Sequence, residues 1–304
     1  MSLYHKYRPT ELEDIRGNSD MVDSLQKMLA DKETCSHSFL LHGPTGCGKT
    51  TLGRIIAKEL NSNGDDFREV NTADFRGIDS IRVIRKNMQF KALQGDCLVW
   101  LIDEAHKLTK DAQNALLKML EDSPKHVYFV LCTTEPTGLL GTVKNRCAQF
   151  QVRPLNERQM FGLLRSVVKA EDETCNKEIY EQIFQDSFGH PRNALQILDQ
   201  VLLAEPEQRL EIAKQAEVVQ SQSIQLCRAL VGNGTAWKEV REILNGLKEE
   251  EPESIRRHVL GYAQAVLLKS DNVRAGLVLE EFVDPFWNSG FPGLTFACYT
   301  VIKN

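Results

Sequence analysis

A chain of 304 residues can form two or three compact domains, each large enough to bury its own core. Hydrophobic residues make up 42% and charged residues 26%, an ordinary balance for a soluble globular protein, and no apolar run reaches the roughly 20 residues that cross a bilayer. The net charge of −5 counts against a protein that holds DNA by itself, so contact with nucleic acid would need a local basic face or partner subunits.

The N-terminus, which begins Met-Ser-Leu-Tyr-His-Lys-Tyr-Arg-Pro, has no apolar segment typical of a signal peptide. We therefore expect a protein of the cytoplasm, nucleoid or nucleus, or of the host cytoplasm if it is viral, without membrane contact. None of the eight cysteines forms a C-x-x-C pair, and no Cys/His cluster has the spacing of a zinc site. Free, buried thiols in a reducing compartment are expected.

Short apolar runs alternate with amphipathic stretches over the first half of the chain. The runs are Ser38–His42, Arg68–Asn71, Cys97–Asp103, Val127–Cys132 and Ala148–Val152. Those that begin at Cys97 and Val127 are apolar at successive positions, as in strands buried on both faces. Helical patterns such as Thr51–Leu60 and Ala112–Leu120 lie between them. This alternation predicts an α/β layer fold with a parallel sheet.

The pattern changes near Arg153, beyond which helical patterns dominate and strand signals are almost absent. We predict an α/β domain over residues 1–153, a small helical domain over 154–215 and an all-α domain over 216–304. The acidic run Glu249–Glu253 is interpreted as a solvated turn between two helices. Aromatic residues gather near the C-terminus, where they are core or subunit-contact residues: Phe282, Phe286, Trp287, Phe291, Phe296 and Tyr299.

A complete phosphate-binding motif, G-x-x-x-x-G-K-[ST], follows the first apolar run and precedes a helical pattern, the context that such a loop requires. Its glycines let successive backbone N–H groups point at phosphate oxygens. Lys49 would neutralise the β- and γ-phosphates, and the Thr50 hydroxyl would bind Mg²⁺. We therefore predict ATP and Mg²⁺ as ligands. The predicted ATP-binding residues of this loop are Gly43, Pro44, Thr45, Gly46, Cys47, Gly48, Lys49, Thr50 and Thr51.

Two carboxylates, Asp103 and Glu104, end the apolar run from Cys97. Asp103 is predicted to hold the Mg²⁺, and Glu104 to polarise the attacking water. An acidic pair that caps the next helix is the alternative, which the complete phosphate-binding loop outweighs. The letters Asp-Glu-Ala-His also spell the box of a helicase superfamily, but such helicases need two recombinase-like lobes, and one α/β domain does not supply them.

Five further segments resemble motifs of the AAA+ sliding-clamp loaders, which include replication factor C small subunits and the bacterial tau/gamma subunit. Lys6–Pro9 resembles the K-[YW]-R-P opening, and Asn71–Asp79 resembles N-A-S-D-x-R-G-I-D. Val130–Pro136 resembles the sensor 1 segment A-T-T-D-P. Asn145–Cys147 resembles S-R-C with Asn in place of Ser, and Gly189–Leu195 resembles sensor 2, G-x-x-R-x-A-L.

The resemblance implies roles for single residues. Tyr7 and Arg8 belong to the opening that packs near the adenine in this family. Thr134 matches sensor 1 and is expected at the catalytic centre. Arg146 matches the arginine finger, which stabilises charge on the γ-phosphoryl group in the neighbouring subunit's site. Arg192 matches sensor 2 and is expected to reach back to the γ-phosphate.

The likeness covers roughly residues 4 to 200, and the last third matches only in being helical, where the family has its oligomerising collar. One departure is a lack of cysteines in residues 51–96, where the bacterial tau/gamma subunit carries a cysteine zinc module. The middle of this domain therefore resembles the zinc-free replication factor subunits.

A basic helix face follows Asp79, which we expect to cap a helix beginning near Ser80. Apolar residues at one helical spacing are expected to face the core: Ile81, Ile84 and Met88. Polar residues form a second face: Arg82, Arg85, Lys86 and Gln89. By the resemblance, this helix lines the chamber that tracks the phosphate backbone of primer–template DNA, with Arg76, Lys107 and Lys110 as further contacts. A solvated basic face is the alternative.

These observations favour an ATP-hydrolysing clamp-loader subunit that acts in a ring, expected to be pentameric, with a sliding clamp and primer–template DNA as partners. Two alternatives stay open. One is a different DNA-acting AAA+ motor, such as a branch-migration or helicase-loading ATPase, although such motors lack the combined set of motifs. The other is a nucleotide-binding scaffold subunit, although none of the catalytic residues is missing here.

Overall fold

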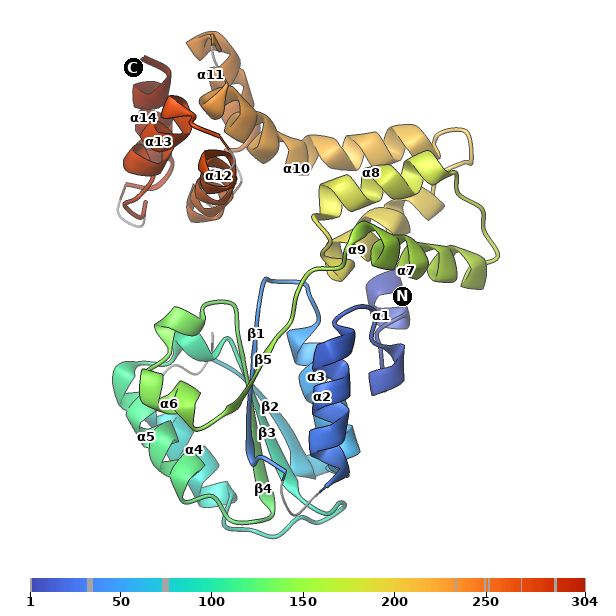
Figure 1. The fold of residues 1–304 in the computed structure, drawn as a ribbon, viewed down its shortest axis with the longest axis vertical. Helices are drawn as coiled ribbons and strands as arrows, with labels where there is room; N and C mark the ends of the chain where they lie inside the picture. The colour runs from blue at the N-terminus through green and yellow to red at the C-terminus, as the bar shows by residue number, and fades with distance from the viewer. Residues whose placement is uncertain are drawn as a thin grey trace. The chain divides into compact units, whose positions relative to one another are not determined.

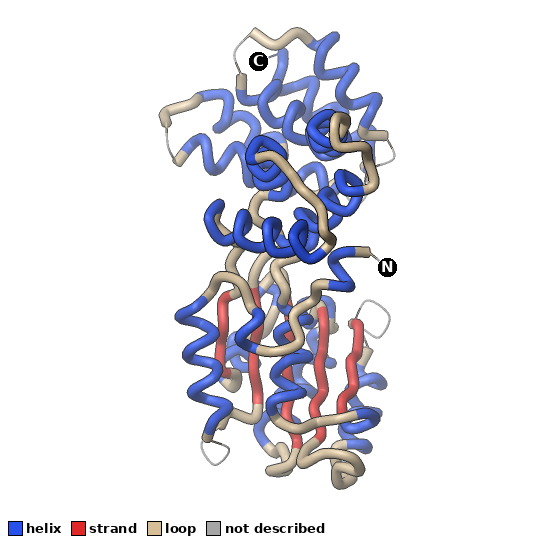
Figure 2. Tube along the Cα trace, turned by 90° about the vertical axis from the view of Figure 1, so that its right-hand side faces the viewer, coloured by secondary structure: helices blue, strands red, loops and turns tan. Residues whose placement is uncertain are grey.

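A parallel five-stranded sheet forms the centre of the computed structural model's first part, with strands in one layer in the order β2-β3-β4-β1-β5 (Figures 1 and 2). The strands are β1 Ser38–His42, β2 Phe67–Asn71, β3 Leu98–Asp103, β4 Val127–Thr133 and β5 Ala148–Gln151. In the register, Leu40 lies opposite Leu131 of β4 and Gln149 of β5. The predicted parallel sheet is confirmed.

Helices cover both faces of this sheet (Figure 1). One face carries α2 (Ser19–Ala30) and α3 (Lys49–Glu59), and the other carries α4 (Ile78–Asn87), α5 (Lys110–Glu121) and α6 (Gly141–Asn145). Short helical pieces complete this layer: α1 Leu3–Lys6, η1 Leu12–Asp14, η2 Gly64–Asp66, η3 Ala105–Lys107 and η4 Pro136–Gly138.

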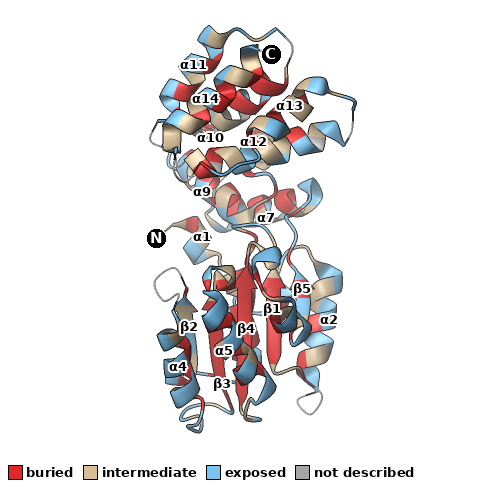
Figure 3. Ribbon diagram, turned by 90° about the vertical axis from the view of Figure 1, so that its left-hand side faces the viewer, coloured by how far each residue is buried: buried red, intermediate tan, exposed pale blue. Residues whose placement is uncertain are grey.

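Successive side chains of each inner strand enter different cores because a strand alternates its faces. Phe39 and Leu41 pack in the core beneath α2 and α3, whereas Leu40 between them packs beneath α4 and α5. In β4 every residue is buried, and in β3 only Asp103 is not fully buried (Figure 3). Both strands are therefore covered on both faces, as their continuous apolar runs predicted.

Helix α3 lies close against the sheet at Gly53. A Cβ atom at this position would lie 2.4 Å from Leu101 Cδ1 and 3.2 Å from Val130 Cγ1. Leu101 belongs to β3 and Val130 to β4, so the helix contacts both strands through bare backbone. The φ angle of Gly53 is not in the left-handed region, so the glycine is explained by the missing Cβ, which allows the close approach, and not by its conformational freedom.

Helix α4 begins two residues earlier than its predicted start near Ser80, and the predicted cap is wrong. Gly77 stands at the N-cap with extended backbone, and no side chain caps the helix. Asp79 lies in the first turn instead, where the positive end of the helix dipole stabilises its carboxylate. This carboxylate also pairs with Arg82 at 2.8 Å. The predicted apolar stripe is confirmed, since Ile81 and Ile84 are buried.

Three helices follow the sheet: α7 (Glu157–Ala170), α8 (Lys177–Ser187) and α9 (Pro191–Leu202). Asn156 and Gln159 form a capping box at the start of α7, in which each side chain accepts a hydrogen bond from the other residue's backbone N–H. Helix α9 begins with Pro191, whose fixed φ angle and missing N–H suit the first helical turn.

The described residues are 2–31, 35–72, 77–232, 234–248, 250, 252–268, 270–286 and 289–303. They form two units, Met1–Arg209 and Leu210–Asn304, and the predicted three-domain division remains a prediction. No helix in the described ranges is long and apolar enough to cross a membrane. All eight cysteines are free, and only Cys175 is not buried.

The second unit is all-helical, as expected from its patterns. Its helices are α10 Arg209–Val231, which starts at the boundary, α11 Trp237–Gly246, α12 Pro252–Leu267, α13 Val273–Glu281 and α14 Gly290–Lys303. Among the aromatic residues near the C-terminus, Phe282 and Phe286 are core residues, whereas Phe296 and Tyr299 are exposed. Trp287 lies outside the described residues.

The interpretation of the acidic run as a solvated turn is wrong for Glu253, which is buried. This residue is buried in the first turn of α12, where its carboxylate pairs with Arg256 at 2.6 Å and accepts the Phe286 N–H at 3.0 Å. Burial alone would raise the pKa of Glu253, but the Arg256 and Phe286 hydrogen bonds hold it below its ordinary value. Arg256 also donates to the Phe282 carbonyl, at 2.8 Å. This residue therefore ties α12 to the segment after α13.

Glu253→Ala is expected to destabilise the second unit by about 2 kcal/mol, because it leaves the Arg256 guanidinium without its carboxylate. Urea unfolding followed by hydrogen–deuterium exchange in α12 and α14 measures this unit by itself. The exposed Glu250→Ala is the matched control, with little expected change. The folded-state pKa of Glu253 is lowered, so the difference from wild type should be full at neutral pH and shrink as the pH falls below about 4. An equal loss in both variants would contradict this prediction.

Candidate functional site

The phosphate-binding loop begins at Gly43, directly after β1. Gly43 has a φ angle of +149°, and a Cβ atom there would lie 2.0 Å from the Val152 carbonyl oxygen. The Gly43 N–H donates to the Thr133 carbonyl at 3.2 Å, and the Val152 N–H donates to the His42 carbonyl at 2.8 Å. The loop therefore leaves the sheet between the ends of β4 and β5, at a place where only glycine fits.

Left-handed backbone carries the loop into α3. Gly46 and Gly48 have φ angles of +76° and +99°, which glycine adopts without strain. A Cβ atom at Gly48 would meet no atom within 4 Å, so conformation rather than space requires the glycine. Helix α3 starts at Lys49, and the first N–H groups of a helix have no partner within it. This helix end is suited to bind an anionic phosphate.

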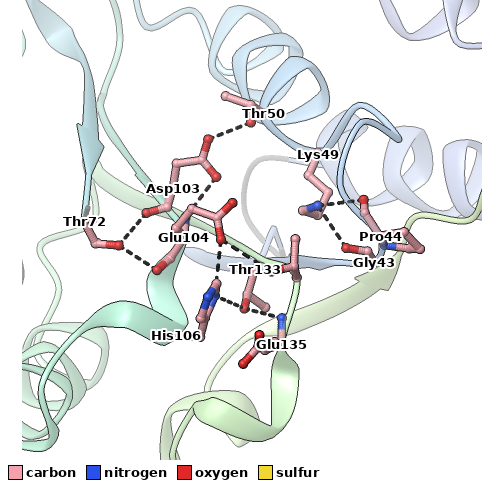
Figure 4. A network of polar contacts seen from close by, with 11 residues as sticks. Gly43, Pro44, Lys49, Thr50, Thr72, Asp103, Glu104, His106, Thr133 and Glu135 are labelled. Carbon is pink, nitrogen blue, oxygen red and sulfur yellow. Dashed lines mark hydrogen bonds and ion pairs between the residues drawn. The ribbon is translucent and has the colours of Figure 1, made fainter. Parts of the chain in front are cut away.

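Lys49 points back into the loop, where its ammonium donates to the carbonyl oxygens of Gly43 and Pro44, both at 2.9 Å (Figure 4). Only 6% of Lys49 is exposed. Burial lowers its pKa, although the nearby carboxylates of Glu104 and Asp103 oppose this effect. The neutral carbonyls leave the charge of Lys49 uncompensated at close range, so phosphate oxygens are the better partners.

Cys47 completes the loop without adding charge. Burial raises the pKa of its thiol to about 11, so the side chain is neutral at physiological pH. A thiolate at this position would repel phosphate, whereas a neutral thiol packs as a small apolar group. The residue therefore fits the loop sterically and electrostatically.

Thr50 and Asp103 meet across the site. The Thr50 hydroxyl donates to Asp103 Oδ2 at 2.7 Å, and the Glu104 N–H donates to Asp103 Oδ1 at 2.9 Å. Hydroxyl and carboxylate oxygens are ligands that Mg²⁺ accepts, and Mg²⁺ usually keeps phosphate or water oxygens as its other ligands. No group of three or more His, Cys, Asp or Glu residues that could hold a metal occurs within the described ranges. The pair therefore fits an ion that arrives with the nucleotide's phosphates.

Glu104 lies beside the ends of β3 and β4. Its φ angle is +52°, which turns the chain sharply after β3. The Thr134 hydroxyl donates to Glu104 Oε2 at 3.4 Å. His106 Nδ1 lies 3.4 Å from the same oxygen (Figure 4). The structure thus brings Thr134, the predicted sensor 1 residue, into contact with Glu104. It adds His106, to which the sequence assigned no role.

A cavity of about 340 Å³ adjoins the loop. Its lining includes the predicted residues Tyr7, Arg8, Gly46, Cys47, Gly48, Thr51 and Arg192. Sequence reasoning missed others that line it: Tyr4, Asp14, Ile15, Arg16, Asn18, Met21, Ser166 and Pro191. Among these, Pro191 lies within the segment that resembles sensor 2 and Tyr4 lies near the K-Y-R-P opening, whereas the others gave no signal. A cavity of this size, open beside a phosphate site, suits a nucleoside.

Arg192 approaches the loop from α9. Its backbone N–H donates to the Gly46 carbonyl at 3.3 Å, and its guanidinium lies 5.8 Å from the Tyr4 ring centre. Arg8 lies on the same ring at 5.9 Å, so one aromatic side chain holds two cations. The sensor 2 segment and the N-terminal opening, which are distant in sequence, therefore adjoin the same loop.

Arg146 is not among the described residues that line the cavity. It is the C-cap of α6, and its guanidinium pairs with Glu121 at the end of α5, at 2.9 Å. Both side chains are partly exposed. The structure therefore separates Arg146 from the loop of its own chain.

The predicted DNA face is exposed on α4, which packs against α5. Its cations are Arg82, Arg85 and Lys86, and the cations near the start of α5 are Lys107 and Lys110, all exposed. Arg76 lies outside the described residues. Neither group lines the cavity beside the phosphate-binding loop.

Comparison with known proteins places this chain beside bacterial replication proteins. The family model described as DNA polymerase III, delta subunit, matches residues 63–156. DNA polymerase III subunit gamma/tau of Mycobacterium tuberculosis is 32% identical over 225 residues, and subunit tau of Bacillus subtilis is 34% identical over 222. Each alignment covers 66% of this chain and 39% of the relative's length, so the chain spans well under half of these relatives. The resemblance that the motifs predicted is confirmed.

Solved structures show the same fold. The Thermotoga maritima RuvB Holliday junction branch migration motor matches with a TM-score of 0.59 at 22% identity, over 80% of both chains. A variant of the same RuvB matches with a TM-score of 0.62 at 19% identity, over 80% of this chain and 88% of that one. At such low identity the likeness concerns the fold alone. The predicted AAA+ fold class is confirmed.

Lys49→Ala is expected to abolish ATP binding, weakening it by at least about a hundredfold, because the variant removes the cation that balances the β- and γ-phosphates. Titration with a fluorescent ATP analogue measures the affinity. Lys58→Ala, which removes an exposed lysine from the same helix, serves as the control and should bind normally. Unchanged binding by the Lys49 variant would reject this loop as the nucleotide site.

Proposed function

We propose that this chain is an ATP-hydrolysing subunit of a sliding-clamp loader that opens a clamp and places it on primer–template DNA. The ATPase part of the proposal is carried by one observation, the contact of the phosphate-binding loop with the carboxylates at the end of β3 through Thr50 and Asp103. The replication part is supported by the similarity to gamma/tau subunits.

Each predicted site residue has a place in this reaction. Lys49 and the loop N–H groups bind the phosphates, while Thr50 and Asp103 would hold Mg²⁺, which would supply charge neutralisation to the phosphates. Glu104 orients and polarises the attacking water, and the hydroxyl of Thr134, directly after β4, donates to that carboxylate. Arg192, in the first turn of α9, contacts the γ-phosphate.

Arg146 is proposed as a finger that acts in the site of a neighbouring subunit. Its pairing with Glu121, away from the cavity of its own chain, supports action in trans. An arginine in this role stabilises the charge that develops on the transferring phosphoryl group. Hydrolysis then requires that subunits assemble so that each site meets the arginine of its neighbour. The subunits are proposed to form a pentameric ring, held together through the helical C-terminal unit.

The basic residues of α4 and of the start of α5 are proposed to contact the phosphate backbone of primer–template DNA. Their exposure and their spacing on one helix face support this role. Phosphate contacts carry no base information, so binding would depend on the structure of the DNA rather than on its sequence. The acidic net charge of the chain means that several subunits must combine their cations. A cytoplasmic or nucleoid location follows from this role.

Two alternatives are less well supported. A branch-migration motor is suggested by the RuvB-like fold, but identities of 19–22% carry no functional argument, whereas the gamma/tau relatives are 32–34% identical. A nucleotide-binding scaffold subunit without hydrolysis would not need the Thr134–Glu104 contact.

Arg146→Ala is expected to retain ATP binding and to lower hydrolysis by the assembled loader roughly a thousandfold, because the neighbouring site loses a cation that acts on the transition state. Steady-state turnover and analogue binding measure the two properties separately. Arg158→Ala, an exposed arginine of α7, is the matched control. Full turnover by the Arg146 variant would rule out the finger.

The loader assignment is tested by ATP hydrolysis with and without primer–template DNA and a sliding clamp, over a range of salt. The chain is assayed in complex with its partner subunits. We expect DNA and clamp together to stimulate turnover, and the stimulation to fade with salt because each phosphate contact releases counterions. Stimulation by branched or single-stranded DNA with no effect of clamp would instead favour another AAA+ motor.

A further inference from the structure

The chain reverses direction directly after β3. Glu104 adopts left-handed backbone, and the 3₁₀ turn η3 follows at once. The hydroxyl of Thr72, at the end of β2, donates to the carbonyls of both Asp103 and Glu104, at 2.9 and 2.6 Å. This buried hydroxyl fixes the turn from the neighbouring strand. The turn brings His106 back against the carboxylate of Glu104 (Figure 4).

His106 is held on more than one side. Its side chain is 11% exposed, and its Nδ1 lies 3.0 Å from the Thr133 hydroxyl and 3.4 Å from Glu104 Oε2. Its Cβ packs against Gly138, where an added Cβ would come within 3.1 Å. The imidazole therefore links the end of β3 to the end of β4 at a fixed distance from the predicted base.

The hydrogen-bond pattern indicates which ring nitrogen carries the proton. The ionised Glu104 carboxylate can only accept, so Nδ1 contacts Oε2 favourably only as N–H. Thr133 Oγ1 accepts the Glu135 N–H at 3.0 Å and has a second lone pair for the same Nδ1–H. The Thr134 hydroxyl donates to Oε2 as well, at 3.4 Å. Oε2 thus accepts the Thr134 hydroxyl and lies within ion-pair distance of His106 Nδ1, whereas no hydrogen bond engages Oε1 within the described part of the chain.

We propose that His106 is a positioning residue, which as the Nδ1–H tautomer fixes the rotamer of Glu104 so that Oε1 faces the attacking water. This inference rests on the proposed ATPase function and adds a residue to it. His106 itself touches neither nucleotide nor water. Its action is to keep Oε2 engaged, because a carboxylate free to rotate would spend less time in the reactive geometry.

Kinetics of the assembled loader test the role. His106→Ala should lower kcat about tenfold with KM for ATP unchanged, since the base is misplaced and the phosphate contacts are intact. His106→Asn should restore most of the rate, because its amide nitrogen can lie where Nδ1 lies. His106→Gln, which carries the amide one bond farther out, should resemble His106→Ala. Equal losses in the Asn and Gln variants, or a loss in KM alone, would overturn the proposal.

A double-mutant cycle with Glu104→Gln separates this inference from the proposed function. Glu104→Gln should bind ATP and lose turnover, and adding His106→Ala should lower the residual rate no further. If Glu104→Gln keeps full turnover, the role proposed for Glu104 fails. If Glu104→Gln is inactive but His106→Ala turns over normally, or if the two losses multiply, the positioning role alone fails.

The tautomer gives a measurement that needs no turnover. Imidazole ¹⁵N–¹H correlation spectra of the full chain, labelled at histidine and assigned with His106→Asn, distinguish a proton on Nδ1 from one on Nε2. We expect Nδ1–H in the wild type and a weakened preference in Glu104→Ala. An Nε2–H tautomer in the wild type would place a lone pair against the carboxylate and refute the proposal.

Discussion

The pairing of β4 between β1 and β3 is the constraint on which the whole site depends. Because the three strands are parallel and in register, their carboxyl ends meet at one edge of the sheet. The phosphate-binding loop leaves that edge after β1, Thr133 ends β4 with Thr134 directly after it, and Asp103 ends β3 with Glu104 directly after it. Segments separated by more than fifty residues thereby meet within hydrogen-bonding distance, as Thr50 and Asp103 do at 2.7 Å. Each strand is buried on both faces, so this alignment is protected by the two cores of the domain.

Local patterns were sufficient to predict the sheet and the loop. Continuous apolar runs predicted β3 and β4, since such runs are typical of strands covered on both sides. The glycines and Lys49 of the loop form one motif because they are close in sequence. Partners distant in sequence could not be predicted in this way. Glu253 looks like part of a solvated acidic run, and only the packing of the segment around Phe286 against α12 shows it buried. Asp79 suits a helix cap, but the backbone had already entered the helix at Ile78.

In the candidate site, too, residues that are close in sequence could be predicted and partners that are distant in sequence could not. The sequence identified the groups that touch phosphate, because these form a motif. It gave no role to Thr72, which holds the backbone turn from the end of β2. Nor did it give one to His106, which contacts the Glu104 carboxylate from η3, or to Thr133 of β4, which contacts His106. Nor did it identify Tyr4, which lies between Arg8 and Arg192. Residues that orient other residues carry no motif of their own, since their effect depends on the fold that brings them close.

The bare backbone contact at Gly53 has a mechanical consequence. At Gly53 the Leu101 side chain of β3 and the Val130 side chain of β4 pack directly against the backbone of α3, so any residue with a Cβ would push α3 away from the sheet. Arg192, which lines the cavity beside the loop, donates its backbone N–H to the Gly46 carbonyl at 3.3 Å and lies near the Tyr4 ring. A shift of α3 away from the sheet would also lengthen the 2.7 Å contact between Thr50 of α3 and Asp103 of β3.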